Sequence, residues 1–235
     1  MPYRCLFHVH TRRSFDSVLS ARTILSRSMR SAVQVVIVTD HNTIQGSLDA
    51  QALTESDTAP LVITAAEYQS EKGDIIGIFL NEEIQSRRSA EIIYQIHAQN
   101  GLVILPHPYK GHTLDDELLS GVDLVETYNG RCSETDNAQA RQLAEQWKLP
   151  SIAGADAHCS IELHSAMNEF PLDPPRSALE FREHLLTAPR AFVVSRAPVI
   201  CRPYSQMVKA VKTKNPRLFL YQLKRLALAL AHGQQ

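Results

Sequence analysis

RCLFHVH (residues 4–10) and QVVIVTDH (residues 34–41) are the two stretches that decide the fold. Each is an apolar, β-branched or aromatic run that predicts a buried strand, and each ends in polar side chains. Similar runs recur along the chain, separated by stretches with helical periodicity. The other predicted strands cover residues 61–65, 74–79, 102–105, 123–127, 151–153 and 191–194.

The segments between these strands predict helices. Ser20 is a suitable cap for a helix that reaches Arg30, and the other predicted helices cover residues 86–99, 134–147 and 177–186. Regular strand–helix alternation favours a mostly parallel sheet. Seven or eight strands in 235 residues suit an α/β barrel better than an open sheet. We therefore expect residues 1–195 to form the barrel.

Residues 196–235 are expected to add basic helices that belong to the same domain. From residue 190 onward there are nine Lys or Arg and no Asp or Glu, whereas residues 1–189 hold 15 basic and 25 acidic side chains. Docking on the acidic barrel is the favoured interpretation of this tail. Contact with a nucleic-acid backbone or with anionic lipid is the alternative. The apolar stripe of the last helix comprises Leu220, Leu223, Leu226, Ala227 and Leu230.

The composition, 44% hydrophobic and 21% charged with net charge −1, excludes collagen-like, low-complexity and disordered chains. No stretch approaches the roughly 18 consecutive apolar residues of a membrane span, and no signal peptide is expected, so the predicted location is the cytoplasm. The four cysteines are scattered, which argues against a disulfide framework and a thiolate zinc site. The sequence does not indicate an oligomeric state.

Imidazoles and carboxylates follow six of the predicted strands. In a parallel barrel the carboxyl ends of all strands face one mouth, so side chains far apart in the sequence would converge there. Taken singly, each has an ordinary explanation, such as a helix cap for Asp40 or a solvated loop for Glu67. Together they predict a metal site. The residues are His8, His10, Asp40, His41, Glu67, His107, Glu126, Asp156 and His158.

Imidazole and carboxylate ligands without thiolates indicate zinc, manganese or iron. The candidates are too many for one tetrahedral ion, so we expect two or three divalent ions. Glu67 has two carboxylate oxygens and is a suitable bridge between two of them.

Four motifs in this order resemble the PHP family, named for polymerase and histidinol phosphatase: FHVHTRRSFDS (residues 7–17), VTDHNTIQG (38–46), LPHPY (105–109) and GADAH (154–158). The resemblance covers about residues 4–160. It implies a distorted (β/α)7 barrel with a trinuclear metal centre. Most members are phosphoesterases, including phosphatases and exonucleases.

Carried over by motif, the resemblance implies three metal sites. The first uses His8, His10, Glu67 and Asp156; the second shares Glu67 and adds His107; the third uses Asp16, His41 and His158. Glu126 stands where some members have a histidine ligand of the second site. Gly-Ala-Asp-Ala-His replaces the usual Gly-Ser-Asp-Ala-His, a change beside the ligands.

The predicted activity is hydrolysis of a phosphate ester by a hydroxide that bridges two ions, in a phosphatase or a small-nucleotide phosphodiesterase. The expected substrate is a small phosphorylated molecule. Asp156 would orient the attacking hydroxide, and His112 would donate a proton to the leaving group. The expected phosphate contacts are Arg131, Lys110, Arg12 and Arg13. The alternatives are an exonuclease acting on DNA or RNA, a noncatalytic metal-binding module, and amide or lactone hydrolysis.

Overall fold

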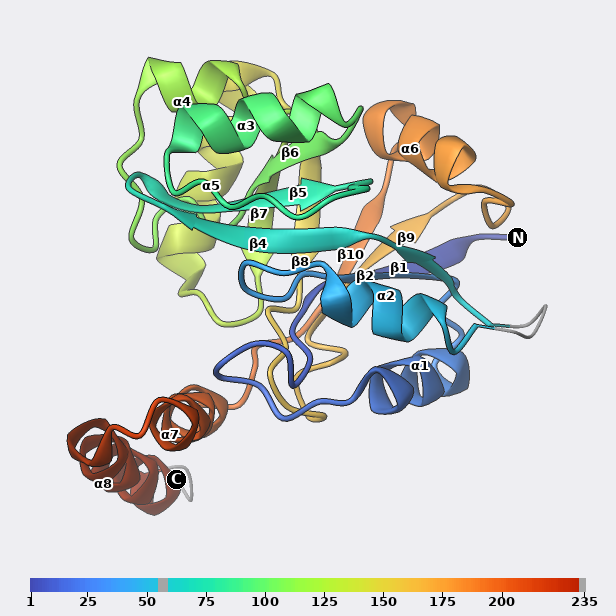
Figure 1. Ribbon diagram of the computed structural model, residues 1–235. Helices are drawn as coiled ribbons and strands as arrows, with labels where there is room; N and C mark the ends of the chain where they lie inside the picture. The colour runs from blue at the N-terminus through green and yellow to red at the C-terminus, as the bar shows by residue number, and fades with distance from the viewer. Residues whose placement is uncertain (55–58, 233–235) are drawn as a thin grey trace.

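The computed structural model describes residues 1–54 and 59–232 and has a mixed α/β fold (Figure 1). In chain order the elements are β1 (Tyr3–Val9), α1 (Ala21–Arg30), β2 (Val35–Val38), α2 (Gln45–Gln51), β3 (Leu61–Ile63), β4 (Ala65–Ser70), β5 (Gly73–Ile78), α3 (Ser89–Ala98), β6 (Leu102–Leu105), α4 (Asp116–Ser120), β7 (Leu124–Asn129), α5 (Glu134–Trp147), β8 (Ser151–Gly154), β9 (Ala166–Phe170), α6 (Ala178–Thr187), β10 (Ala191–Val194), α7 (Cys201–Lys212) and α8 (Pro216–His232).

The strands form two five-stranded sheets, with orders β10-β9-β1-β2-β3 and β4-β5-β6-β7-β8. Only half of the strand pairs are parallel, because β1/β9, β9/β10, β4/β5 and β5/β6 are antiparallel. The expectation of a mostly parallel sheet is therefore wrong. One hairpin accounts for two of these antiparallel pairs: the predicted strand at 61–65 is divided into β3 and β4, and β4 turns back into β5 at Gly73, whose φ of +116° suits glycine. The other two pairs come from β9, which lies between β1 and β10.

The two sheets meet at their ends through two isolated bridges, Val9–Ala157 and His41–Glu67. Passing through these bridges, β1, β2 and β4 to β8 follow one another in a ring. Within the described residues, however, continuous strand pairing does not run across either junction, so a closed seven-stranded barrel is not confirmed. Both junctions lie beside predicted metal ligands, which places the site where the sheets come together.

Strand alternation divides the core into layers. Cys5 and Phe7 of β1 pack between the two sheets, whereas Leu6 packs on the other side, toward α1 and α2. A third cluster, which includes Ile92 of α3 and Leu143 of α5, covers the outer face of the second sheet. The strands are thus buried on both faces, as their continuous apolar runs predict.

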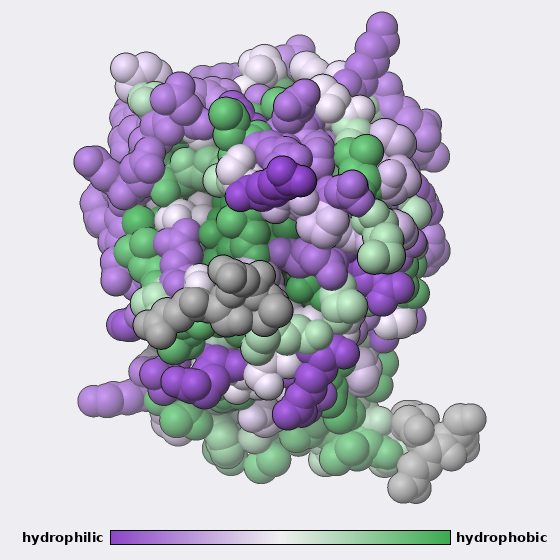
Figure 2. Space-filling model, turned by 90° about the vertical axis from the view of Figure 1, so that its right-hand side faces the viewer, coloured by the Kyte–Doolittle hydropathy of each residue, from purple (hydrophilic) through white to green (hydrophobic). Residues whose placement is uncertain are grey.

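The C-terminal helices α7 and α8 pack against each other and project from one corner of the molecule (Figure 1). α7 is bound to the loop after β1, because the Lys212 amino group donates to the carbonyl oxygens of Arg12, Ser14 and Ser17 at 2.7–2.9 Å. The stripe on α8 is less buried than expected: Leu220 is 65% exposed and Leu230 54%. Hydrophobic residues accordingly gather along the lower edge of the molecule in Figure 2.

None of the helices in the described part of the chain is both long and apolar enough to cross a bilayer. Residues 233–235 of the predicted C-terminal extension lie outside the described residues.

Candidate metal centre

A bulge in β1 directs two histidines into the site. Simple alternation would place His8 and His10 on the same face as Leu6, away from Cys5 and Phe7. The pairing of β1 with β2 instead shifts between Phe7 and Val9, and His8 has a left-handed backbone with φ of 63°. This shift turns both imidazoles toward the junction of the sheets, as bulges beside functional sites often do.

Glu67 of β4 lies at the centre of the cluster and is 1% exposed. Its Oε1 lies 3.1 Å from His107 Nε2 and 3.4 Å from His8 Nε2. Its Oε2 lies 3.0 Å from His41 Nδ1 and 3.5 Å from His10 Nε2. One carboxylate therefore faces four imidazoles from three separate segments, a geometry that suits a group bridging two cations.

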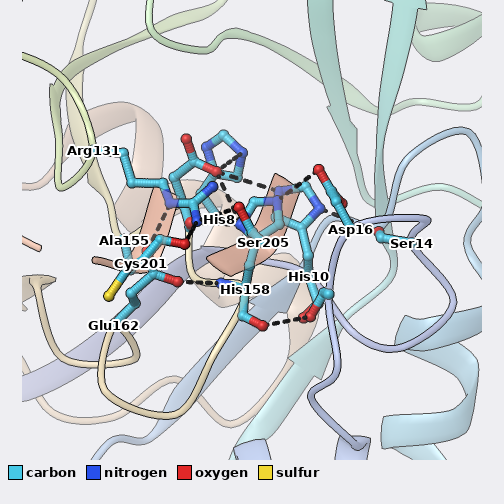
Figure 3. Close-up of polar contacts among 12 residues, drawn as sticks. His8, His10, Ser14, Asp16, Arg131, Ala155, His158, Glu162, Cys201 and Ser205 are labelled. Atoms are coloured by element: carbon cyan, nitrogen blue, oxygen red, sulfur yellow. Dashed lines mark hydrogen bonds and ion pairs between the residues drawn. The ribbon is translucent and has the colours of Figure 1, made fainter. Parts of the chain in front are cut away.

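Asp156 and Asp16 complete the cluster on either side of Glu67. Asp156 Oδ1 lies 3.7 Å from His10 Nε2 and 3.9 Å from His8 Nε2. Asp16 Oδ2 lies 3.2 Å from His158 Nε2 and 3.5 Å from His41 Nε2. Figure 3 shows His8, His10, Asp16 and His158 converging from different segments of the chain.

Asp40, which follows β2, holds the loop that carries Asp16. Its Oδ1 accepts hydrogen bonds from the backbone of Thr11 and the hydroxyl of Ser14, and its Oδ2 accepts one from the Thr11 hydroxyl. Gly46 leaves the space for this carboxylate, because a Cβ there would lie 1.7 Å from Asp40 Oδ2. Asp40 therefore positions the site without facing it.

Three site residues have left-handed backbone conformations that are unfavourable for their side chains. His8, His107 and Asp156 have φ values of 63°, 28° and 50°. Such conformations cost roughly 1–3 kcal/mol each and tend to cluster at functional sites, where the surroundings hold them. The strain therefore marks the same side chains as the convergence does.

Glu126 does not face the other carboxylates, and it lies behind His8. Its Oε1 accepts a hydrogen bond from His8 Nδ1 at 2.7 Å, and its Oε2 accepts from the backbone N–H of His107 and from Asn129 Nδ2. This fixes the His8 ring with Nε2 directed into the cluster, as carboxylates behind metal-binding histidines do. A Cβ at Gly154 would lie 1.6 Å from Glu126 Oε1, so only glycine leaves room for this contact.

The buried charges are strongly coupled. Burial opposes ionisation of Glu67, but His8 and His41 hold the pKa of its carboxyl well below the usual value. Burial also opposes charge on His8, yet Glu126, Glu67 and Asp156 raise its pKa well above the usual value. The pKa of His41 rises to about 10, because Glu67 and Asp16 outweigh its burial.

Several buried polar atoms in the cluster make no hydrogen bond, although charged groups lie near them. Among the described residues, His8 Nε2, His10 Nε2, Asp16 Oδ1, His41 Nδ1 and His107 Nδ1 make no hydrogen bond. Unsatisfied buried polar atoms are rare and costly, and these five lie close together in one convergent set of imidazoles and carboxylates. Divalent cations would satisfy these lone pairs. The donor set is that of zinc, manganese or iron sites.

Asp74 is a further candidate ligand. It was not among the predicted ligands, because it stands at the start of a predicted strand and not at its end. It groups with Glu67 and His107, and burial together with Glu67 raises its pKa. In a parallel barrel the start of a strand lies far from the mouth. β5 is antiparallel, so its first residues lie beside the carboxyl ends of the parallel strands. The feature of the sequence that could have indicated this position for Asp74 is the hairpin turn that ends at Gly73.

Lys110 and Arg131, two of the expected phosphate contacts, lie at the site. Lys110 Nζ is 3.2 Å from Asp156 Oδ2. Arg131 pairs with the buried Glu162 at 2.7 Å and donates to Ser205 Oγ on α7, as Figure 3 shows. Both residues line the pocket above the cluster. Arg131 thus also links the site to the C-terminal helices.

Arg12 and Arg13 are not brought to this pocket. They line a separate pocket on the other side of the loop after β1. Arg13 makes two hydrogen bonds to Asp49, at 2.8 and 3.0 Å. The loop that carries Asp16 turns their side chains away from the cluster.

His112, the expected proton donor, has a geometry that gives this role no support. Its Nε2 donates to the Asp74 carbonyl at 2.8 Å. Burial and the neighbouring His107 lower its pKa to about 4. At neutral pH the ring is uncharged, and its N–H is already used by the backbone.

The pocket above the cluster has a volume of about 270 Å³. One wall consists of the predicted ligands, and the opposite wall comes from α7 and α8. The position of α7 and α8 at this pocket could not be predicted from the sequence, because it depends on how the two helices pack against the rest of the fold. Their lining residues are Arg202, Gln206, Lys209, Gln222 and Arg225.

A family model described as PHP-associated matches residues 134–188. The chain is also 36% identical over 139 residues to the uncharacterized protein MJ1587 of Methanocaldococcus jannaschii, a match that covers 52% of this chain and 81% of the relative.

Two solved structures show the same kind of fold. A two-domain protein of Bacteroides vulgatus containing a predicted PHP-like metal-dependent phosphoesterase superposes with a TM-score of 0.69 at 17% identity, covering 83% of this chain and 65% of that one. An amidohydrolase of Chromobacterium violaceum, with bound sulfate and no metal, superposes with a TM-score of 0.56 at 12% identity, covering 68% of this chain and 89% of that one. The chain thus spans slightly less than two thirds of the Bacteroides protein.

Proposed function

The chain belongs to the PHP family of metal-dependent phosphoesterases, and we propose that it hydrolyses a phosphate ester of a small molecule, as a phosphatase or a small-nucleotide phosphodiesterase. The observation that carries this proposal is the set of unpaired imidazole nitrogens and carboxylate oxygens around Glu67. We also propose that β1, β2 and β4 to β8 correspond to the distorted seven-stranded barrel of the family, because the two isolated bridges complete their ring order.

The residues divide into the groups that the family resemblance implies. His8, His10, Glu67 and Asp156 would hold one ion, Glu67 and His107 a second, and Asp16, His41 and His158 a third. Asp74 groups with Glu67 and His107 and so extends the second site. Glu126 would orient His8 from behind instead of binding an ion.

Bound divalent ions supply Lewis acidity toward phosphate oxygens and lower the pKa of water. The side chains around them position the reacting groups. Lys110 and Asn129 both donate to Asp156 Oδ2, which fixes the direction of this carboxylate. Burial opposes the charge on Asp156, yet Lys110, His8 and Arg131 hold its pKa well below the usual value. Asp156 therefore stays ionised, so it accepts hydrogen bonds and does not act as a proton donor. Lys110 also offers a cation to a phosphate oxygen at the pocket wall.

The test combines elemental analysis with a phosphate-release screen after reconstitution with manganese, zinc or iron. We expect at least two ions per chain and turnover of p-nitrophenyl phosphate or a bis-phosphodiester. His107→Gln should lose metal and activity. The matched control is His97→Gln, since His97 is an exposed histidine that pairs with Asp123 on the outside of the molecule. A chain that stays metal-free, or that turns over an amide but no phosphate ester, would refute the proposal.

A nuclease is a second candidate, favoured by the cations that α7 and α8 place on the pocket wall. Cations that follow a phosphate backbone make activity strongly dependent on salt. Hydrolysis of an oligonucleotide that falls steeply between 50 and 200 mM salt, on the order of 10³-fold, would favour it. A protein that binds metal but turns over no substrate would favour the noncatalytic module.

A further inference from the structure

The α7–α8 hairpin forms one wall of the pocket over the predicted metal ligands, and that wall is cationic. Arg202 and Lys209 come from α7, and Arg225 comes from α8. The opposite wall holds the acidic side chains Asp16, Glu67, Asp74 and Asp156. A ligand in this pocket therefore lies between two surfaces of different charge.

The hairpin cations are not neutralised by neighbouring carboxylates. Within the described part of the chain, neither Arg202 nor Arg225 has an ion-pair partner, and the chain has no Asp or Glu after residue 190. By contrast, Lys110 is paired with Asp156, and Arg131 with Glu162. Lys110 and Arg131 are thus partly compensated, whereas the hairpin cations remain available to an anionic ligand.

The hairpin is held in place by polar contacts on both sides of the pocket. On one side, Lys212 binds three carbonyl oxygens of the loop after β1. On the other, Arg131 joins Glu162 to Ser205 of α7. These contacts fix where the cations stand relative to the metal cluster, so the wall is prepared before a ligand binds.

Lys209 and Gln222 connect the wall with the centre of the site. Lys209 Nζ lies 4.5 Å from the centroid of the Phe15 ring, and Phe15 stacks on His41 at 4.5 Å. Gln222 of α8 is 5% exposed, and its Oε1 makes no hydrogen bond to any described residue. An amide oxygen only accepts hydrogen bonds, so this Oε1 at the pocket wall indicates a ligand that also carries a donor such as a hydroxyl group.

We propose that Arg202, Lys209 and Arg225 bind a second oxyanion, a phosphate or a carboxylate, of a small phosphomonoester whose other phosphate is held at the metal cluster. This inference rests on the proposed phosphoesterase function and specifies its substrate class. The hairpin cations have no carboxylate partner among the described residues, and a second oxyanion would pair with them. The volume of about 270 Å³ suits a small molecule.

The test uses three matched substrates on the metal-loaded full chain: glycerol 3-phosphate, 3-phosphoglycerate and glycerol 1,3-bisphosphate. All three share a three-carbon skeleton. Glycerol 3-phosphate has no second oxyanion, 3-phosphoglycerate has a carboxylate, and glycerol 1,3-bisphosphate has a second phosphate. We expect kcat/KM to be at least about tenfold higher for one or both of the compounds with two oxyanions, since charged hydrogen bonds contribute that much or more. Which of the two is preferred identifies the second oxyanion.

The double variant Arg202→Gln/Arg225→Gln should reduce this preference about tenfold, mainly through KM. The control Arg217→Gln/Lys224→Gln removes the same charge from the same hairpin, at exposed residues that do not line the pocket, and should keep the preference. Thermal unfolding of both variants checks that the fold is intact. Equal kcat/KM for all three substrates, or a preference that survives the double variant, overturns the inference. So does an oligonucleotide that is hydrolysed more efficiently than all three.

Calorimetric binding of the same compounds separates this inference from the proposed function. If no phosphate ester is turned over by protein of confirmed metal content, the proposed activity fails. Tighter binding of the compounds with two oxyanions, lost in the double variant, then still supports the role of the hairpin. Equal binding of all three compounds overturns it.

Discussion

At the scale of single residues, His8 and Glu126 show how the site is assembled. The His-x-His spacing predicted two rings on one face, and this is what the structure contains. The alternation before His8 would have directed that face away from the site, and only the bulge at His8 corrects it. Glu126 was expected among the ligands because it ends a strand. Its partner could not be identified from the sequence, because the contact joins residues 118 positions apart.

Glu126→Gln tests the orienting role. The amide group would meet two donors, the His107 N–H and Asn129 Nδ2, where a carboxylate oxygen now accepts. We expect metal affinity to fall about 10- to 100-fold, as for other groups behind metal ligands. Glu67→Gln should abolish binding of at least one ion. Glu169→Gln, which breaks only a partly exposed pair with Arg4, is the control. Metal titrations followed by calorimetry provide the measurement.

Proton release is a second expectation at this scale. The raised pKa values of His8 and His41 mean that both rings are positively charged, with both ring nitrogens protonated, in the metal-free protein at pH 7. Binding a cation requires the free lone pair, so metal uptake should release protons, and apparent affinity should increase from pH 6 to pH 8. In the metal-free protein, the charged His41 ring stabilises the fold below its ordinary pKa of 6.5. This contribution disappears as the pH rises through about 10. Calorimetry in buffers of different ionisation enthalpy would show no buffer dependence if the rings were neutral.

At the scale of elements, most strands and helices were predictable within a few residues. Helix α5 coincides with its prediction, because Ser133 and Asp136 form a capping box and Pro150 follows its end. β9 was missed, since Ala-Met-Asn-Glu-Phe lacks the β-branched pattern, and it is formed by pairing with β1 and β10. Propensity cannot show such pairing, because it depends on distant residues.

Lys212→Met tests the anchoring of α7. Three carbonyl oxygens of the loop after β1 would lose their shared donor. We expect a loss of about 1–2 kcal/mol, which corresponds to a decrease in Tm of roughly 2–8 °C, and earlier proteolysis between β10 and α7. Lys224→Met on α8 is the control, because Lys224 is exposed. Equal melting of the two variants would contradict the anchoring role.

At the scale of the whole molecule, the predicted ligands join two sheets. In the first sheet, His8 lies in β1, and His10 and His41 follow β1 and β2. In the second sheet, Glu67 lies in β4 and His107 follows β6. The backbones meet there through two isolated bridges only. Strand–helix alternation predicted a closed barrel, which is not confirmed, and the predicted strand at 191–194 lies at the edge of the first sheet. The division into two sheets could not be predicted, because the same apolar runs are compatible with a closed barrel and with two sheets.

Metal removal should therefore loosen the junction of the sheets before the rest of the fold. We expect a chelator to lower Tm and to increase amide hydrogen exchange in residues 7–16, 39–42, 64–68 and 154–158. Exchange in β6 and α3, which contribute to the cluster on the outer face of the second sheet, should change little. Uniform exchange changes across the chain would show that the ions do not join the sheets.

The distribution of the site along the chain has a consequence for how the protein is made. Every predicted ligand precedes residue 159, whereas the cationic wall begins at Arg202. A ribosome synthesises and releases the amino-terminal part first. We therefore expect the nascent chain to present its ligands through an open mouth, and to be able to bind ions before the last two helices dock and narrow the entrance.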